Sequence, residues 1–240
     1  MKINNVTRMI WILCLGLVIA SCSSNSDESS IQEPDNSDYT YLALGDSYTI
    51  GESVSTSERW PVQLVKRLKE RDYPTADAKI IAKTGWTTGN LLSAINSDLP
   101  NIKYDLVSVL IGVNNQYQGR SLEEYEKDLN TIFKKAIAHS VNGKDGVFVV
   151  STPDYGATPA GAFNAENIGR KIDEFNAVLK KVSEEYQLSY YNITPISRKA
   201  KNDLSLVAGD GLHPSGKMYT LWVEEFIDEV AAKIDLNSNK

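Results

Sequence analysis

Short apolar runs alternate with longer segments of helical periodicity along most of the chain. The longer segments carry apolar residues three or four positions apart, as an amphipathic helix does. This alternation predicts an α/β domain, with a parallel sheet covered by helices on both faces. The expected strands span residues 39–44, 78–82, 104–112, 146–152 and 188–193, and the expected helices span residues 60–72, 87–95, 121–140, 164–187 and 216–234.

Local signals support several of these elements. The run "YDLVSVLIG" is almost continuously apolar, which is typical of a central parallel strand buried on both faces. Ser121 and Glu124 have the spacing of a capping box at the start of a helix. Thr87 or Thr88 is expected to cap the helix that follows the second strand.

The first residues have the pattern of a targeting segment. Lys2 and Arg8 precede an apolar stretch, Met9–Ala20, which is too short for a transmembrane helix and fits a signal peptide. The segment "IASC", which ends at Cys22, resembles a bacterial lipobox. That resemblance implies a lipoprotein signal peptide over residues 1–21 and lipidation of Cys22. The alternative is an ordinary secretory peptide with an incidental cysteine.

The next segment, residues 22–38, is rich in serine and acidic residues and has almost no apolar residue. It is expected to be a disordered linker between the anchor and a domain over residues 39–240. The sequence holds two cysteines, Cys14 and Cys22, so the mature domain would have no thiol for a disulfide, a metal or a nucleophile. Several acyl chains would hold the protein firmly at a membrane, which predicts an extracytoplasmic bacterial lipoprotein.

Length and charge narrow the function classes. A chain of 240 residues suits one α/β domain better than two. Lys and Arg number 25 against 31 Asp and Glu, the net charge is -6, and no basic block stands out. This balance argues against a nucleic acid as partner.

Polar loops that contain glycine follow the expected strands, and two of them carry a serine and a histidine. Gly45-Asp46-Ser47 follows the first strand, and "GDGLHP" near the C-terminus contains Asp210 and His213. A serine nucleophile needs a base to take its proton and a third group to orient that base. We therefore expect the first strand to stop at Gly45, so that Ser47 is exposed at the sheet edge and faces the His213 loop. His139, the other histidine, ends a helix and suits its dipole.

Each of these features has a simpler interpretation. Ser47 could merely cap the next helix, and His213 could lie in an ordinary surface turn. A loop between strand and helix could also cradle phosphate, but "GDSYTIGES" lacks the lysine of a P-loop and Asp46 would repel phosphate.

Two further positions could stabilise a developing oxyanion. Asn114 follows the third strand and could donate from its side-chain amide, and Gly85 follows the second strand and could donate its backbone N–H. Asparagine is also common in turns, so "VNNQ" could be a turn without a chemical role.

Taken together, the four motifs "GDSYTIG", the isolated Gly85, "GVNN" and "DGLHP" resemble, in order, the blocks of the SGNH (GDSL-type) hydrolase family. The resemblance spans residues 39–234. It implies a flavodoxin-like three-layer α/β/α sandwich with about five parallel strands. It also implies Ser47 as nucleophile, His213 as base, Asp210 as its orienting residue, and an oxyanion hole from the Ser47 and Gly85 N–H groups with the Asn114 side chain.

One position departs from the family. The third block usually reads Gly-x-Asn-Asp, and here Asn115 replaces the aspartate. The expected oxyanion residue Asn114 is intact, so activity should survive. Any hydrogen bond that a carboxylate at position 115 would accept is in question.

The resemblance implies a serine esterase that works through an acyl-enzyme and needs no metal or organic cofactor. Short-chain esters, lysophospholipids, thioesters and acetylated sugars are all open as substrates. Trp86 and Tyr117 could wall an acyl pocket, stack on a sugar or simply pack the loops, and residues 153–167 could form a lid or a connector. A different class also stays open, a catalytically inactive glycan-binding lipoprotein on the same fold.

Overall fold

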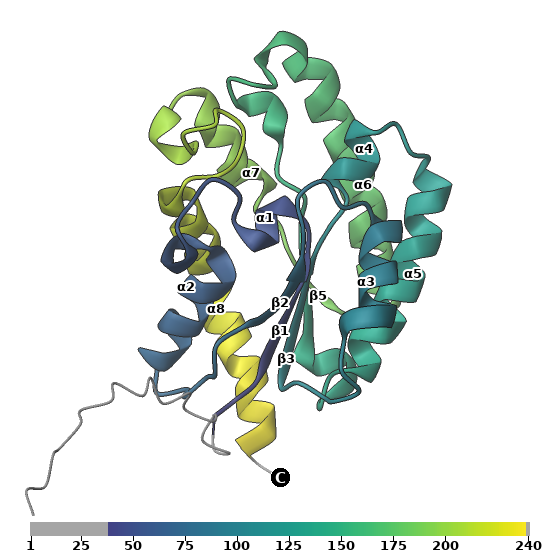
Figure 1. The fold of residues 1–240 in the computed structure, drawn as a ribbon, viewed down its shortest axis with the longest axis vertical. Coiled ribbons are helices and arrows are strands. Elements are labelled where there is room, and N and C mark those ends of the chain that lie inside the picture. The colour runs from purple at the N-terminus through teal and green to yellow at the C-terminus, as the bar shows by residue number, and fades with distance from the viewer. Residues whose placement is uncertain (1–37, 239–240) are drawn as a thin grey trace, which may run out of the picture. The chain divides into compact units, whose positions relative to one another are not determined.

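The computed structural model describes residues 38–238, and these form one five-stranded sheet flanked by helices (Figure 1). The strands are β1 (Tyr41–Gly45), β2 (Lys79–Ala82), β3 (Leu106–Leu110), β4 (Val147–Val150) and β5 (Ser189–Tyr191). Their order across the sheet is β2-β1-β3-β4-β5, and every neighbouring pair is parallel. This order is the flavodoxin-like one, with its switch point between β1 and β3.

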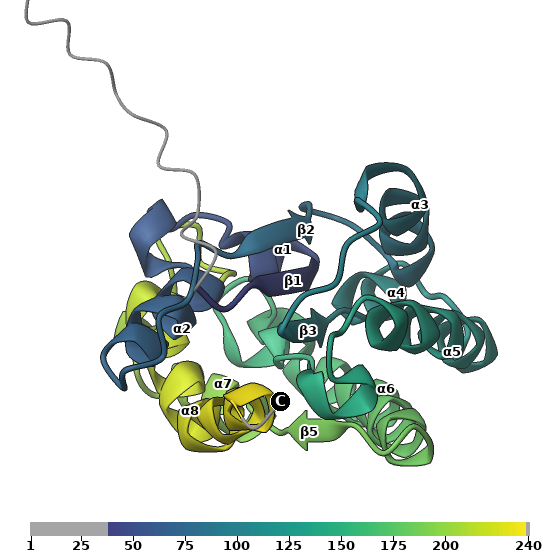
Figure 2. The ribbon, with the colours of Figure 1, turned by 90° about the horizontal axis from the view of Figure 1, so that it is seen from below.

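Helices cover both faces of the sheet, as the views in Figures 1 and 2 show. On one face lie α2 (Trp60–Lys69) and α8 (Gly216–Ser238), and on the other lie α3 (Thr88–Asp98), α5 (Leu122–Ala138) and α6 (Ala165–Glu185). The predicted three-layer α/β/α sandwich is therefore confirmed.

The first strand, β1, is central in the sheet because its residues are apolar on both faces of the strand. All five residues of β1 are buried, and successive side chains of a strand point to opposite faces. Tyr41 and Ala43 pack in the core beneath α2 and α8, whereas Leu42 and Leu44 pack in the core beneath α3 and α5.

Helix starts follow the expected capping, with one difference. The Thr87 side chain accepts a hydrogen bond from the Asn90 N–H at the start of α3, and the Ser121 side chain accepts one from the Glu124 N–H at the start of α5. The return bond of a capping box at Ser121 is not formed within the described residues. The Glu124 carboxylate instead lies 3.7 Å from the Arg120 guanidinium.

Short helices that the hydrophobic pattern does not predict lie in the loops. They are α1 (Ser47–Ile50), α4 (Val113–Tyr117) and α7 (Thr194–Ser197), and single 3-10 turns add to them. Helices of four or five residues are too short to show a 3.6-residue period, so no pattern marks them. Two of them, α1 and α4, carry the candidate residues Ser47 and Asn114.

The expected signal peptide, Cys22 and the linker over residues 22–38 lie outside the described residues, apart from Asp38 itself. Among residues 38–238, no helix is both long enough and apolar enough to cross a membrane.

Candidate active site

Ser47 is held at the sharp turn from β1 into α1. The Asp46 side chain accepts a hydrogen bond of 3.0 Å from the Tyr48 N–H and so caps this short helix. Gly45 is required here because a Cβ at this position would clash with the Thr49 side chain and the Leu110 carbonyl. The turn therefore places Ser47 over the carboxyl end of the sheet.

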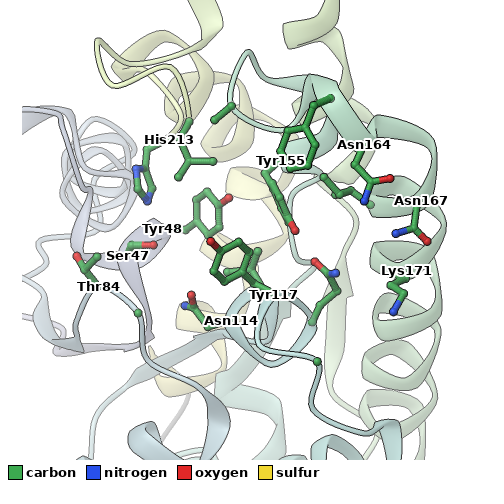
Figure 3. Close-up of a pocket in the computed structure, with 18 residues that line it drawn as sticks. Ser47, Tyr48, Thr84, Asn114, Tyr117, Tyr155, Asn164, Asn167, Lys171 and His213 are labelled. Carbon is green, nitrogen blue, oxygen red and sulfur yellow. The ribbon is translucent and has the colours of Figure 1, made fainter.

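Ser47 is less exposed than the sequence led us to expect. Only 4% of the residue is accessible, because it lines a cavity rather than lying on the open edge of the sheet. The cavity has a volume of about 590 Å³ and is also lined by Gly85, Asn114 and His213. Four of the candidate residues, from four different loops, thus meet around one space (Figure 3).

Asp210 and His213 form the orienting pair that their spacing suggests. The Asp210 Oδ2 atom lies 2.6 Å from His213 Nδ1, and Oδ1 accepts hydrogen bonds of 2.9 Å from the Leu212 and His213 N–H groups. A carboxylate only accepts, so Nδ1 carries the proton and Nε2 is left as the acceptor. The His213 ring points toward Ser47 in Figure 3.

A third residue, Ser53, joins this pair and was missed in the sequence. Its hydroxyl donates a 2.7 Å hydrogen bond to Asp210 Oδ2. Partial burial acts to raise the pKa of Asp210, but the hydrogen bonds from the His213 ring and the Ser53 hydroxyl outweigh it and hold that pKa well below its usual value. The carboxylate is therefore charged at neutral pH. No local pattern marks Ser53, which lies 157 residues from its partner.

The Tyr48 ring lies next to the His213 imidazole. The centroids of the Tyr48 and His213 rings are 5.5 Å apart, with an interplanar angle of 58°. Burial, with the nearby Asp46 charge, raises the pKa of Tyr48 well above its usual value, so the phenol stays neutral. The His213 imidazole therefore packs against an uncharged aromatic ring.

The three residues expected to supply oxyanion donors, Ser47, Gly85 and Asn114, all line the cavity. The N–H groups of Ser47 and Gly85 have no acceptor within residues 38–238, and Gly85 adopts a left-handed conformation with φ of 82°. The Asn114 Nδ2 atom donates a 3.0 Å hydrogen bond to the Trp86 carbonyl. This bond fixes the amide, and its second hydrogen is free to donate.

The Ser47 hydroxyl makes no hydrogen bond to the His213 ring within the described part of the chain. Such bonds are often long before a substrate binds and tighten when it does. No group of three or more Asp, Glu, His or Cys residues in the described part is arranged to hold a metal ion.

The other residues named from the sequence divide between cavity and core. Tyr117 lies at the rim of the cavity and is 73% exposed, whereas Trp86 packs against the core beside α3. The segment over residues 153–167 forms one wall and contributes Tyr155, Phe163 and Asn164 among others. His139 lies at the end of α5, as the sequence predicts, and its Nδ1 lies 2.9 Å from the Ile102 carbonyl.

A family model matches residues 43–221, which hold every motif of this site. The chain belongs to the GDSL-like Lipase/Acylhydrolase family. It is therefore a carboxylic ester hydrolase of the GDSL type. Family membership favours the enzyme over the glycan-binding alternative.

Several known proteins are similar to this GDSL-type hydrolase. It is 27% identical to the spore germination lipase LipC of Bacillus licheniformis, over 77% of this chain and 93% of that protein. The crystal structure of TesA matches with a TM-score of 0.65 and 20% identity, over 81% of this chain and 99% of TesA. An acetylxylan esterase from Geobacillus stearothermophilus matches with a TM-score of 0.62 and 19% identity, over 80% of this chain and 94% of that chain. The two structures share the fold.

Proposed function

We propose that the protein hydrolyses carboxylic esters through an acyl-enzyme formed on Ser47. The observation that carries this proposal is the 2.6 Å contact between Asp210 Oδ2 and His213 Nδ1, beside a cavity that Ser47 also lines. This contact leaves His213 Nε2 free to take the Ser47 proton.

In this mechanism the Ser47 oxygen attacks the ester carbonyl while His213 takes its proton. The oxyanion of the tetrahedral intermediate accepts hydrogen bonds from the Ser47 and Gly85 N–H groups and from the Asn114 amide. The intermediate then collapses, and the leaving alcohol takes the proton from His213. Water repeats the sequence and releases the acid, with no metal or organic cofactor.

Covalent labelling together with turnover tests the assignment. A fluorophosphonate should modify the wild-type protein at Ser47, and Ser47→Ala or His213→Ala should lower the hydrolysis of a 4-nitrophenyl ester by roughly 10³-fold or more. Ser93→Ala, at an exposed position of α3, is the matched control. Undiminished labelling or turnover in Ser47→Ala would rule out this nucleophile.

For the substrate, we propose short-acyl, lysophospholipid or acetylated-carbohydrate esters. The cavity of about 590 Å³ has room for any of these acyl groups, and its lining mixes aromatic with amide side chains. Rates on acyl esters of rising chain length and on acetylated sugars would separate the three. A maximum at long chains would exclude an acetyl esterase, and a steep fall beyond acetate would exclude a lysophospholipase.

We also propose that the enzyme is a lipoprotein anchored to a bacterial membrane through Cys22 and exposed outside the cytoplasm. The support is the apolar stretch followed by "IASC". When the full chain is expressed in a bacterium, radiolabelled palmitate should enter the protein and its Cys14→Ser variant but not Cys22→Ser. Equal labelling of the Cys22→Ser variant would contradict the anchor.

A further inference from the structure

The cavity has a second chemical environment at the side opposite Ser47. Asn164, Asn167 and Lys171, at and after the start of α6, line that wall, while Ser47 and His213 lie across the space (Figure 3). Nothing in the hydrolytic mechanism uses this wall.

Lys171 is a cation without a carboxylate partner. The side chain is partly buried and forms no ion pair within residues 38–238. Other cations of the same helix are paired, since Arg170 contacts Glu174, Lys180 contacts Glu184 and Lys181 contacts Glu126. No Asp or Glu of the described residues lines the cavity, so the Lys171 charge faces it unneutralised.

Asn167 adds a hydrogen-bond donor next to this charge. Its Oδ1 atom accepts a 2.9 Å hydrogen bond from the Arg170 guanidinium. A guanidinium has no acceptor, so this contact fixes the orientation of the amide and leaves its NH₂ group without an acceptor among the described residues. The Asn167 nitrogen lies on the cavity side in Figure 3.

We propose that Lys171 and Asn167 form an anion subsite, which binds a carboxylate, phosphate or sulfate carried by the ester substrate away from its scissile bond. A positive charge and an amide donor fit an anion, and a cationic group there would be repelled. The lining of the cavity also includes the apolar side chains of Val113 and Ile168, which could contact an apolar part of the ligand. The inference rests on the proposed function, because it assigns the substrate class of the same site.

The test compares matched pairs of esters that differ in charge. On the acyl side, the 4-nitrophenyl monoester of adipic acid is compared with its methyl-capped diester. On the alcohol side, butyryl glycerol 3-phosphate is compared with monobutyrin. The quantity compared is kcat/KM for the anionic ester divided by kcat/KM for the neutral ester of the same pair. For at least one pair, we expect Lys171→Gln to lower this ratio by roughly tenfold, which is the effect of losing one charge-assisted hydrogen bond.

Two variants sharpen this result. Lys171→Glu should make the enzyme prefer the neutral ester over the anionic one. The control Lys134→Gln lies at an exposed position of α5 outside the cavity and changes the net charge by the same amount as Lys171→Gln, so it should leave the ratio as in the wild type. The pair that responds identifies whether the anion belongs to the acyl or the alcohol portion. Equal ratios in the wild type and Lys171→Gln for both pairs would overturn the subsite.

A binding measurement separates failure of the subsite from failure of the esterase assignment. Calorimetric titration of the Ser47→Ala variant with monomethyl adipate and with butyryl glycerol 3-phosphate needs no turnover. Adding Lys171→Gln to that variant should weaken binding of at least one of them by a similar factor, and unchanged affinity for both would contradict the subsite. Absence of turnover of every neutral ester by the wild type would instead contradict the proposed hydrolysis and leave this binding result valid.

Discussion

Asn115, at the position where the family usually carries an aspartate, makes both of its hydrogen bonds to Thr88. Its Oδ1 atom accepts from the Thr88 N–H at 2.9 Å, and its Nδ2 atom donates to the Thr88 hydroxyl at 2.7 Å. That hydroxyl donates in turn to Asp128 Oδ2 at 2.6 Å. The bond that a carboxylate at position 115 would accept from the Thr88 backbone is thus retained by the amide.

The Thr88 hydroxyl has one proton to donate. It accepts a hydrogen bond from Asn115 and donates its own proton to Asp128, so the residues at positions 115 and 128 are coupled. In Asn115→Asp, the carboxylates at positions 115 and 128 would compete for the Thr88 proton. While Asp128 accepts it, the fully buried charge at position 115 would face a lone pair of the Thr88 oxygen. We expect Asn115→Asp to lower the free energy of unfolding at pH 7 by about 1–3 kcal/mol. Chemical denaturation measures this loss.

A second substitution provides the control for this effect. In the double variant Asn115→Asp with Asp128→Asn, the Thr88 hydroxyl can donate to position 115 and accept from position 128. We expect the double variant to recover most of the lost stability, and Asp128→Asn alone to change it little. Additive losses in the double variant would show that the two positions are not coupled.

At the scale of elements, the wall formed by residues 153–164 is tied to the rest of the site at two points. Asp154, which is 6% exposed, accepts a 2.8 Å hydrogen bond from Arg198 Nε and donates its N–H to the Ser197 hydroxyl. Ala160 donates its N–H to the Gly211 carbonyl at 3.0 Å, in the loop that carries His213. This wall is therefore continuous with the loop of the proposed base.

Arg198→Met would remove the charge that faces the Asp154 carboxylate but keep much of the side-chain volume. Because Asp154 is buried and Arg198 is about 39% exposed, we expect a loss of about 1–3 kcal/mol in the free energy of unfolding. Hydrogen exchange over residues 153–164 should become faster, and KM for esters should rise more than kcat falls.

The matched control for this prediction is Arg120→Met. Arg120 and Glu124 form an exposed pair within one helix start, and such pairs contribute only about 0.3–0.5 kcal/mol. Exchange over residues 153–164 should stay at the wild-type rate in this control. Equal effects of the two substitutions would show that the Asp154–Arg198 contact does not hold the wall.

Strands and helices with a clear hydrophobic pattern could be predicted from the sequence. Very short helices and contacts between distant segments could not. All five strands and the helices α2, α3, α5, α6 and α8 lie within a few residues of their expected bounds. The helices α1 and α4 have too few residues for a period. The Ser53–Asp210 hydrogen bond depends on how two distant loops meet, which no local spacing encodes.

For the molecule as a whole, the sheet order explains why motifs spread over the sequence converge. β1 and β3 are neighbours in a parallel sheet, so the loops that follow them, with Ser47 and Asn114, emerge at the same edge. The position of the motifs directly after expected parallel strands indicated this edge. Burial of the site could not be inferred, because it depends on the residues 153–167 that close one wall.

Asp46 makes the stability of the whole domain depend on pH. The residue is fully buried and forms no ion pair within residues 38–238. Burial raises its pKa to about 7, although the nearby N–H groups of Tyr48, Asp46 itself and Gly112 oppose part of this shift. In the unfolded chain the same carboxyl titrates near its usual value of 3.8.

A carboxyl with a raised pKa in the folded state stabilises the fold only while it is protonated. This contribution is complete below about pH 4 and is lost as the pH rises toward 7, in total about 3–5 kcal/mol. Asp210 has the opposite sign, because its pKa is lowered and its contribution disappears as the pH falls below 4. Asp46 should therefore dominate the slope between pH 4.5 and pH 7.

Denaturant unfolding of the wild type and Asp46→Asn across this range measures that slope. Asparagine can still cap α1 by accepting from the Tyr48 N–H, and it does not titrate. We expect the unfolding free energy of the wild type to fall relative to that of the variant as the pH rises, because in this range the unfolded wild-type chain loses its Asp46 proton while the folded protein still holds it. Parallel curves would mean that Asp46 has the same proton affinity in the folded and unfolded chains, and that its burial is compensated by the surrounding N–H groups.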